Sequence, residues 1–287
     1  TNIVIWLVKN HLIMSATAQR KDISDPGVVH AFASQVGDLV HLNYIYLLTV
    51  ADVRATSPDV WNTWKDALLK ELYNATRQAL KRGLDNPLMQ TEFIEDVKNR
   101  VKFELRKSKV KKQDLETLWQ RINEEYFLRY SVDEIIWQSK ALLDKKAKPP
   151  LVLIQKDSSR GGTEIFIYSK IFDGLFAIST SAIDQLGFTI MDARIMQSID
   201  GFTLNSYIIL DQEGGRVTDD YRLQELVERI QSLIENPVDI NTDAKPHLNR
   251  QQKQFTFATE VDFWADPNFD RTVMKVTAYD RPGLLSL

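Results

Sequence analysis

The sequence predicts an all-α helical bundle followed by a ferredoxin-like α+β domain, so the expected fold class is multidomain α and α+β. Apolar residues recur at helical spacing through the first half of the chain. From residue 151 they alternate as in strands, with two amphipathic helices in between. A polar segment that ends in two prolines, residues 145–150, separates the patterns, and we expect a domain boundary there.

The composition is that of a globular protein. The chain has 287 residues, of which 44% are hydrophobic and 26% charged, and its net charge of −3 gives no indication of nucleic-acid binding. It has no cysteine, which excludes disulfides and thiolate metal sites and fits a cytoplasmic location. No apolar run reaches the roughly 18 residues of a membrane span. Because Thr1 already lies in an apolar helical run, we expect a segment of a longer protein.

The first 90 residues predict a bundle of helices. Residues 3–14 suggest a buried helix that carries His11. Asp25-Pro26 combines an N-cap with a residue suited to the first helical position, and residues 39–50 form a third, apolar helix. Ser57 and Pro58 are expected to begin a fourth helix. Its apolar residues are spaced by three and four, namely Trp61, Trp64, Leu68 and Leu72.

One carboxylate stands out in this bundle. Asp52 directly follows a helical run with Leu48 and Val50, so we expect it to be buried. An isolated buried carboxylate is too costly, so Asp52 must be paired or bound to a metal. Two interpretations stay open, a structural ion pair with Arg54 and a metal ligand, and the pattern alone favours the ion pair.

Residues 91–150 predict helices that connect the two domains. Residues 97–112 are rich in Lys and Arg, but interspersed acidic residues indicate a solvated helix face rather than an RNA site. Residues 115–126 have the spacing of an amphipathic helix. Ser131 and Glu134 form a capping box that starts another helix.

The remaining sequence predicts the order β-α-β-β-α-β. Asp200-Gly201 indicates a tight hairpin. Asp173-Gly174 opens the first helix of this domain, where free backbone N–H groups favour an anion such as the carboxylate of an amino acid. Asp173 could then oppose the ammonium group, or it could simply cap the helix. The expected strands are 164–169, 188–197, 202–210 and 255–263, and the expected helices are 174–186 and 221–234.

Three strings carry a resemblance to one family. TVADVRATSPDVWNTWK and WLVKNHLIMSATAQRKDISDP resemble the hydrolytic HD domain of bacterial bifunctional PII uridylyltransferase/uridylyl-removing enzymes (GlnD), and LWQRINEEYFLRYSVDEIIWQ resembles the span that follows it. Residues 168–211 resemble an ACT domain. The resemblance implies the C-terminal part of an HD-type domain at 1–90, a helical connector at 91–150, a first ACT domain at 151–265 and the first strand and loop of a second at 266–287.

The resemblance also implies a metal site. HD domains bind a divalent metal, here Mg or Mn, through a histidine, a His-Asp pair and a later aspartate. The resemblance implies that Asp52 is this later aspartate. It also implies that His11 is a second catalytic residue that holds the metal or the phosphate. The alternative for His11 is a core histidine that is hydrogen-bonded to a carbonyl. No His-Asp pair occurs in the chain, so we expect this segment alone to bind metal weakly and hydrolyse little.

Further site residues follow from the same resemblance. Thr17, Gln19 and Arg20 could contact a phosphate or nucleotide, since arginine offers a fixed fork of donors. The alternative is a solvated loop in which Arg20 pairs with Asp22 or Asp25.

ACT loops usually read Asp-x-Pro-Gly-Leu. The first copy lacks the proline and keeps Asp173, Gly174 and Leu175, whereas the second copy has the full pattern. The implied effector, glutamine, would bind at one or both loops. In the second copy the implied contacts are Asp280, Arg281 and Gly283.

The implied function is an enzyme that attaches UMP to a tyrosine of the PII signal protein and removes it, with no nucleic acid or membrane as partner. The helical domain would supply the metal-dependent hydrolysis. An alternative is a non-catalytic amino-acid-binding regulatory module with a degenerate helical domain, and a third interpretation is a purely structural linker. Loss of activity on mutating Asp52 would separate the first from the second.

Overall fold

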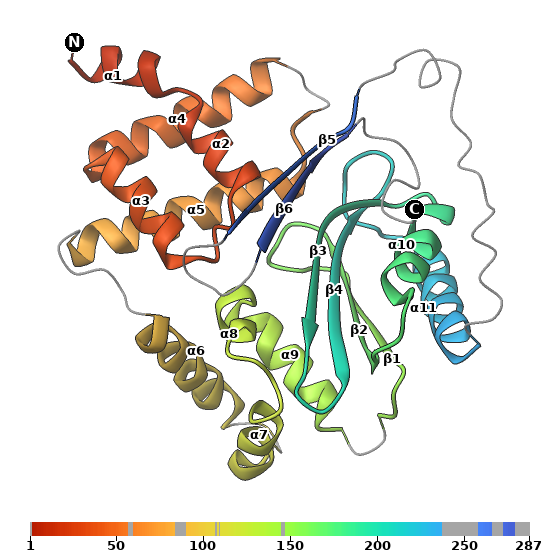
Figure 1. Cartoon of the computed structure of the whole chain (residues 1–287). Coiled ribbons are helices and arrows are strands. Elements are labelled where there is room, and N and C mark those ends of the chain that lie inside the picture. Colours follow the sequence, from red (N-terminus) through yellow and green to blue (C-terminus); the bar gives the residue numbers. More distant parts are fainter. Residues whose placement is uncertain are drawn as a thin grey trace.

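The computed structural model describes residues 2–56, 60–83, 90–106, 108, 110–144, 147–236, 258–265 and 272–278. Figure 1 shows a helical bundle, a second group of helices and a sheet that is flanked by helices. This is the mixed α and α+β class that the sequence predicts. Within the described ranges no helix is long and apolar enough to cross a membrane.

The bundle consists of α1 to α5 and encloses its own core, which includes Met14, Phe32 and Leu72. The expected N-cap of α3 is confirmed, since Asp25 Oδ1 accepts from the backbone N–H of Gly27 at 2.7 Å. The helices are α1 (Asn2–Asn10), α2 (Ile13–Arg20), α3 (Pro26–Val36), α4 (Leu39–Thr56) and α5 (Thr63–Arg82).

Two expectations about this bundle are wrong. The single buried helix over residues 3–14 is two helices separated by a turn at His11, and α1 has no buried residue. The last helix begins at Thr63 rather than before Trp61, because Asn62 is its N-cap and accepts from the N–H of Lys65 at 2.8 Å. The expected cap at Ser57 lies outside the described residues.

The connector is a folded unit of four helices. It comprises α6 (Gln90–Leu105), α7 (Lys112–Trp119), α8 (Glu125–Arg129) and α9 (Val132–Leu142). The capping box at the start of α9 is confirmed, with Ser131 N–H donating to Glu134 Oε2 at 2.6 Å. The core of this unit continues into the sheet through Phe166, Met196 and Leu204. The connector and the sheet therefore share one hydrophobic core.

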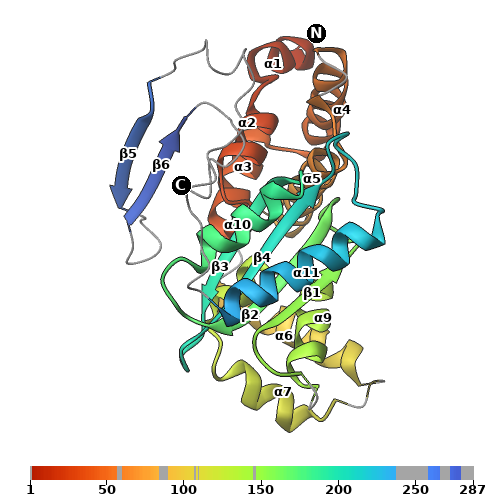
Figure 2. The ribbon, with the colours of Figure 1, turned by 90° about the vertical axis from the view of Figure 1, so that its right-hand side faces the viewer.

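The sheet has four antiparallel strands in the order β1-β2-β4-β3. They are β1 (Leu151–Gln155), β2 (Thr163–Lys170), β3 (Thr189–Gln197) and β4 (Phe202–Leu210). Helices α10 (Leu175–Gln185) and α11 (Asp220–Glu235) cover one face, and the connector covers the other (Figure 2). Side chains alternate along β2, so Ile165 and Ile167 face α10 and α11 while Phe166 faces the connector.

The expected fourth strand is wrong. The edge position beside β2 is occupied by β1, which precedes β2 and pairs with it from Leu151↔Tyr168 to Gln155↔Glu164. Residues 260–265 instead form β5 (Glu260–Ala265), which pairs with β6 (Thr272–Thr277) in a separate hairpin. The order in the main sheet is therefore β-β-α-β-β-α. The loop between β1 and β2 contains Gly161, at φ +79°, which allows this close return.

Candidate functional site

Asp52, the expected buried carboxylate, is exposed near the end of α4. Leu42, Ile45 and Thr49 form the buried stripe of this helix, and Asp52 continues their spacing beyond the packed core. Its backbone carbonyl accepts from Thr56 Oγ1 at 2.8 Å. The expectation of burial is wrong, because helical spacing gives the direction of a side chain but not whether another element covers it.

The proposed ion pair between Asp52 and Arg54 is also not formed. The guanidinium carbon of Arg54 lies 4.8 Å from the ring centroid of Trp61, a cation–π contact. This contact fixes the end of α4 against the chain that leads into α5.

His11 lies exposed in the turn between α1 and α2, where its Nδ1 is 2.9 Å from the carbonyl oxygen of Val8. It shares no hydrogen bond or ion pair with Asp52 in the part of the chain that the structure describes. Over the same residues, no three His, Cys, Asp or Glu side chains gather in a way that could hold a metal ion. The metal role of His11 and Asp52 stays a prediction.

The three residues that were expected to contact a phosphate differ in their burial. Thr17 is buried inside the bundle, whereas Gln19 and Arg20 are exposed at the end of α2. Asp22, the suggested partner of Arg20, lies 3.6 Å from Arg129 of α8 and so links the bundle to the connector.

The glycine loop of the sheet domain opens α10 as expected. Gly174 is the N-cap residue, at φ +93°, with open space around it, and Leu175 is the first, buried residue of the helix. Asp173 is exposed and no side chain caps this helix, so the capping interpretation of Asp173 is not supported. The second loop, with Asp280, Arg281 and Gly283, lies outside the described residues.

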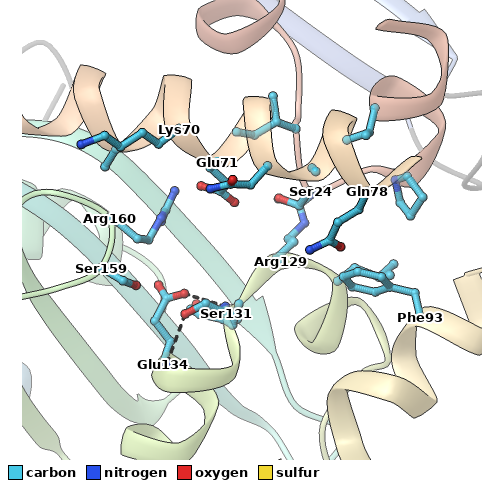
Figure 3. Close-up of a pocket in the computed structure, with 18 of the residues that line it drawn as sticks. Ser24, Lys70, Glu71, Gln78, Phe93, Arg129, Ser131, Glu134, Ser159 and Arg160 are labelled. Carbon is cyan, nitrogen blue, oxygen red and sulfur yellow. Dashed lines mark hydrogen bonds between the residues drawn. The ribbon is translucent and has the colours of Figure 1, made fainter. Parts of the chain in front are cut away.

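The structure adds a site that the sequence did not predict. A cavity of about 650 Å³ lies where the bundle meets the connector and the sheet. Its walls come from α3, α5, α6, α8, α9, the β1–β2 loop and β3 (Figure 3). The volume is within the range of small-molecule sites.

The bundle and the sheet touch closely beside this cavity. A Cβ added to Gly161 would lie 2.1 Å from the carbonyl oxygen of Thr63 and 2.9 Å from Cβ of Ala67. The β1–β2 loop therefore lies directly against the first turn of α5. Only a glycine fits there, because the space is closed and the φ of +79° is unfavourable for other residues.

Buried charges form one wall of the cavity. Arg160 Nη1 donates to Asp192 Oδ2 at 2.7 Å, and Arg194 Nε lies 3.4 Å from the same oxygen. Burial alone would raise the pKa of Asp192, but the two guanidinium groups hold it below its usual value. Asp192 is therefore a stable anion that occupies both arginines.

A fully buried glutamate lies behind this wall. Glu164 of β2 is fully buried and accepts from Ser158 Oγ at 3.1 Å. Burial, followed by the nearby charge of Glu134, raises the pKa of Glu164 to about 8. Glu164 is therefore mostly protonated at neutral pH. The sequence does contain a signal for this cluster, since Glu164, Asp192 and Arg194 are charged residues inside predicted strands.

The fold and this interface define a multidomain chain, in which a helical bundle is docked on an α+β sheet through a folded connector. The family model "Uridylyltransferase GlnD fifth domain" matches residues 89–141, which span α6 to α9. No solved structure matches the chain.

Curated relatives match the whole chain. A bifunctional uridylyltransferase/uridylyl-removing enzyme of Pseudomonas savastanoi pv. phaseolicola is 45% identical over 100% of this chain and 32% of its own length. Enzymes of the same name from Ectopseudomonas mendocina and Stutzerimonas stutzeri are 42% identical, over 99% and 100% of this chain. The chain belongs to this family, and it spans about a third of the length of these relatives.

Proposed function

We propose that this chain is the part of a PII uridylyltransferase/uridylyl-removing enzyme that carries the uridylyl-removing domain and the glutamine sensor. Residues 1–90 would belong to the HD-type domain, 91–150 to the connector, 151–265 to a first ACT domain and 266–287 to the start of a second. The observation that carries the proposal is the match over the whole chain, at 41–45% identity, to enzymes of that printed name.

The metal site of this proposal needs more donors than the described residues supply. A carboxylate is a suitable ligand for Mg or Mn, so the chemistry of Asp52 fits, whereas the imidazole of His11 is a ligand more typical of Zn or Fe. The number of donors does not fit, because no cluster of three forms among the described residues. We therefore assign Asp52 and His11 as a partial ligand set and derive no reaction step from it.

The surface around these two residues supports an incomplete site. Helix α1, which leads into the turn of His11, and helix α4, which carries Asp52, expose several large apolar side chains, and exposed apolar surface of this extent marks a packing or interaction face. In a chain as long as the relatives, we propose that further helices with the missing ligands pack here. Helices α1 and α4 and the turn after α1 expose Val4, Ile5, Val8, Leu12, Val40, Tyr44 and Leu47.

The second candidate is a non-catalytic module that binds an amino acid and regulates another domain. The absence of a three-donor cluster among the described residues favours it. Both candidates keep glutamine as the effector, at the loop of Asp173, Gly174 and Leu175, where the start of α10 provides free N–H groups for a carboxylate. They differ in the role of Asp52.

Mutation of Asp52 in a chain of the relatives' full length tests the enzyme proposal. Asp52→Asn should slow the removal of UMP from uridylylated PII by more than about 100-fold, since even outer-shell changes at metal sites cost about 10–100-fold. The transfer of UMP to PII should not change. Asp114→Asn, at an exposed position of α7, is the matched control. Unchanged removal and unchanged metal dependence in Asp52→Asn would favour the non-catalytic module.

A further inference from the structure

The bundle docks on the rest of the molecule without a shared hydrophobic core. Among the residues that the structure describes, the core of the bundle draws only on residues 6–80, whereas the cores of the connector and the sheet draw only on residues 93–234. Domains move relative to one another unless the interface between them is large and hydrophobic. The docked position of the bundle therefore depends on individual contacts at the interface.

One face of α5 lies against the β1–β2 loop. Thr63, Ala67 and Glu71 follow one another at helical spacing, so they lie on the same side of α5. The first two pack against Gly161 of the loop. Glu71, one turn further along, lines the cavity beside this contact, and so does Arg160, the residue before Gly161. The backbone contact therefore brings Glu71 and Arg160 to the same part of the interface.

Arg160 is held on the sheet side of the interface. Its side chain is 8% exposed, and its Nη1 donates to Asp192 Oδ2 of β3 at 2.7 Å. A guanidinium has five N–H donors, so this carboxylate leaves others for a second acceptor. Figure 3 shows Arg160 extending toward α5, from which Glu71 reaches into the cavity. Arg160 is thus a cation that the sheet presents to the bundle.

Glu71 is the carboxylate that faces this cation from the bundle. It remains accessible from the cavity although protein surrounds it, and within the described ranges it has no hydrogen bond or ion pair. Burial raises the pKa of Glu71 above its usual value, and the charge of Arg160 is the strongest influence in the opposite direction. Arg160 and then Arg194 act on Glu71 more strongly than the like charges of Glu134 and Asp192 do. The sheet side therefore attracts Glu71.

The same attraction acts on Arg160. Burial opposes the charge of its guanidinium, but Asp192, Glu134 and Glu71 together raise the pKa of Arg160 above its usual value. Of these three carboxylates, only Glu71 comes from the bundle, since Glu134 belongs to α9 and Asp192 to β3. Separation of the bundle from the sheet would therefore remove one of the anions that surround Arg160.

We propose that Glu71 and Arg160 form an interdomain charge latch, which holds the bundle docked on the sheet. The two charges attract each other across the cavity, and loss of the charge of Glu71 lets the bundle move away from the sheet. The latch is a conformational device built into the fold. It lies apart from Asp52 and from the glycine loop at Gly174, so its test is independent of the proposed function.

The test measures a distance between the bundle and the sheet domain in the 287-residue chain. The chain has no cysteine, so Gln35→Cys in α3 and Glu225→Cys in α11, both at exposed positions, can carry spin labels. Pulsed EPR then gives the distribution of label distances. We expect one dominant short distance at about 0.1 M NaCl. A larger share of long distances should appear at about 1 M NaCl, because the Debye length falls from about 10 Å to about 3 Å.

Two substitutions in the labelled chain grade the charge at residue 71. Glu71→Gln should raise the ratio of long to short distances about 2- to 5-fold, as expected for the loss of an accessible ion pair, and should reduce the response to salt. Glu71→Lys places a like charge opposite Arg160 and should raise the ratio by more than about 5-fold. Glu92→Lys, at an exposed position of α6, is the matched control and should leave the ratio unchanged.

Three outcomes would overturn the proposal. These are unchanged distances in both variants of Glu71, an equal change in Glu92→Lys, and a salt response in Glu71→Gln as large as that of the wild type. If circular dichroism shows that Glu71→Lys fails to fold, Glu71→Gln decides the case, because the amide keeps the shape of the side chain at an accessible helix position.

Discussion

The buried glutamate of β2 gives the sharpest stability prediction. Glu164 is fully buried, and its Oε1 receives only a long contact of 3.5 Å from Gln138 Nε2. Burial first and Glu134 second raise its pKa to about 8, from 4.5 in the unfolded chain. The folded state therefore holds the proton of Glu164 more tightly than the unfolded state does.

The direction and size of the pH effect follow by linkage. The stability that Glu164 contributes is fully present below about pH 4.5, and it is lost as the pH rises through the folded pKa of about 8. At ~1.4 kcal/mol per pKa unit, the free energy of unfolding falls by about 3 kcal/mol between about pH 5 and pH 8 because of this group alone. Glu164→Gln should remove that loss, since an amide has nearly the same shape and no charge.

The assay is urea unfolding of wild type, Glu164→Gln and the surface control Glu92→Gln at about pH 5 and pH 8. The stability of Glu164→Gln relative to wild type should increase by about 3 kcal/mol from the lower to the higher pH, and the control should follow wild type. Ionisable groups that do not interact with Glu164 affect all three proteins equally and cancel in the difference. Parallel pH profiles for Glu164→Gln and wild type would refute a raised pKa for Glu164.

Two further predictions concern the interface and the glycine loop. Gly161→Ala should lower the free energy of unfolding by more than about 2 kcal/mol, because the added Cβ would overlap the backbone of Thr63. Gly37 has a similar φ but open space around it, so Gly37→Ala is the control and should lower the free energy of unfolding by only about 1 kcal/mol. The same urea assay measures both variants. If glutamine binds at the glycine loop as we propose, it should raise the Tm of the wild type, and Asp173→Asn should reduce that rise because a charge opposite the ammonium group is removed. Calorimetry measures both, and an unchanged rise in Asp173→Asn would place glutamine elsewhere.

Local signals predicted most elements well. Caps at Asp25 and Ser131 act over a few residues, so their role could be recognised before any tertiary contact was known. The strand β1 was missed, since a run of four apolar residues after two prolines does not reveal its partner. β1 occupies the edge of the sheet because a hairpin loop connects it directly to β2. The strand predicted at 255–263 has no such local connection to the sheet.

The predicted and the observed sites differ for a physical reason. Asp52 was expected to be buried because it directly follows an apolar helical run, yet burial depends on which element covers that part of α4. The cavity is built from residues far apart in the chain, such as Glu71, Glu134 and Arg160, so no local motif indicates it. What the sequence did contain is three charges within apolar strands, and buried charges require partners from elsewhere in the fold.

The position of the cavity changes how the two ends of the chain can influence each other. The core of the connector is continuous with the sheet through Phe166 and Leu204, so connector and sheet form one packed unit. The bundle contacts this unit at two places, where Gly161 packs against Thr63 and where Asp22 lies near Arg129. It also forms part of the walls of the charged cavity. Coupling requires a ligand that binds two arrangements with different affinity. A ligand bound in the cavity would meet that condition, because the cavity walls come both from the bundle and from the packed unit of connector and sheet, and movement of one relative to the other changes the contacts of the ligand.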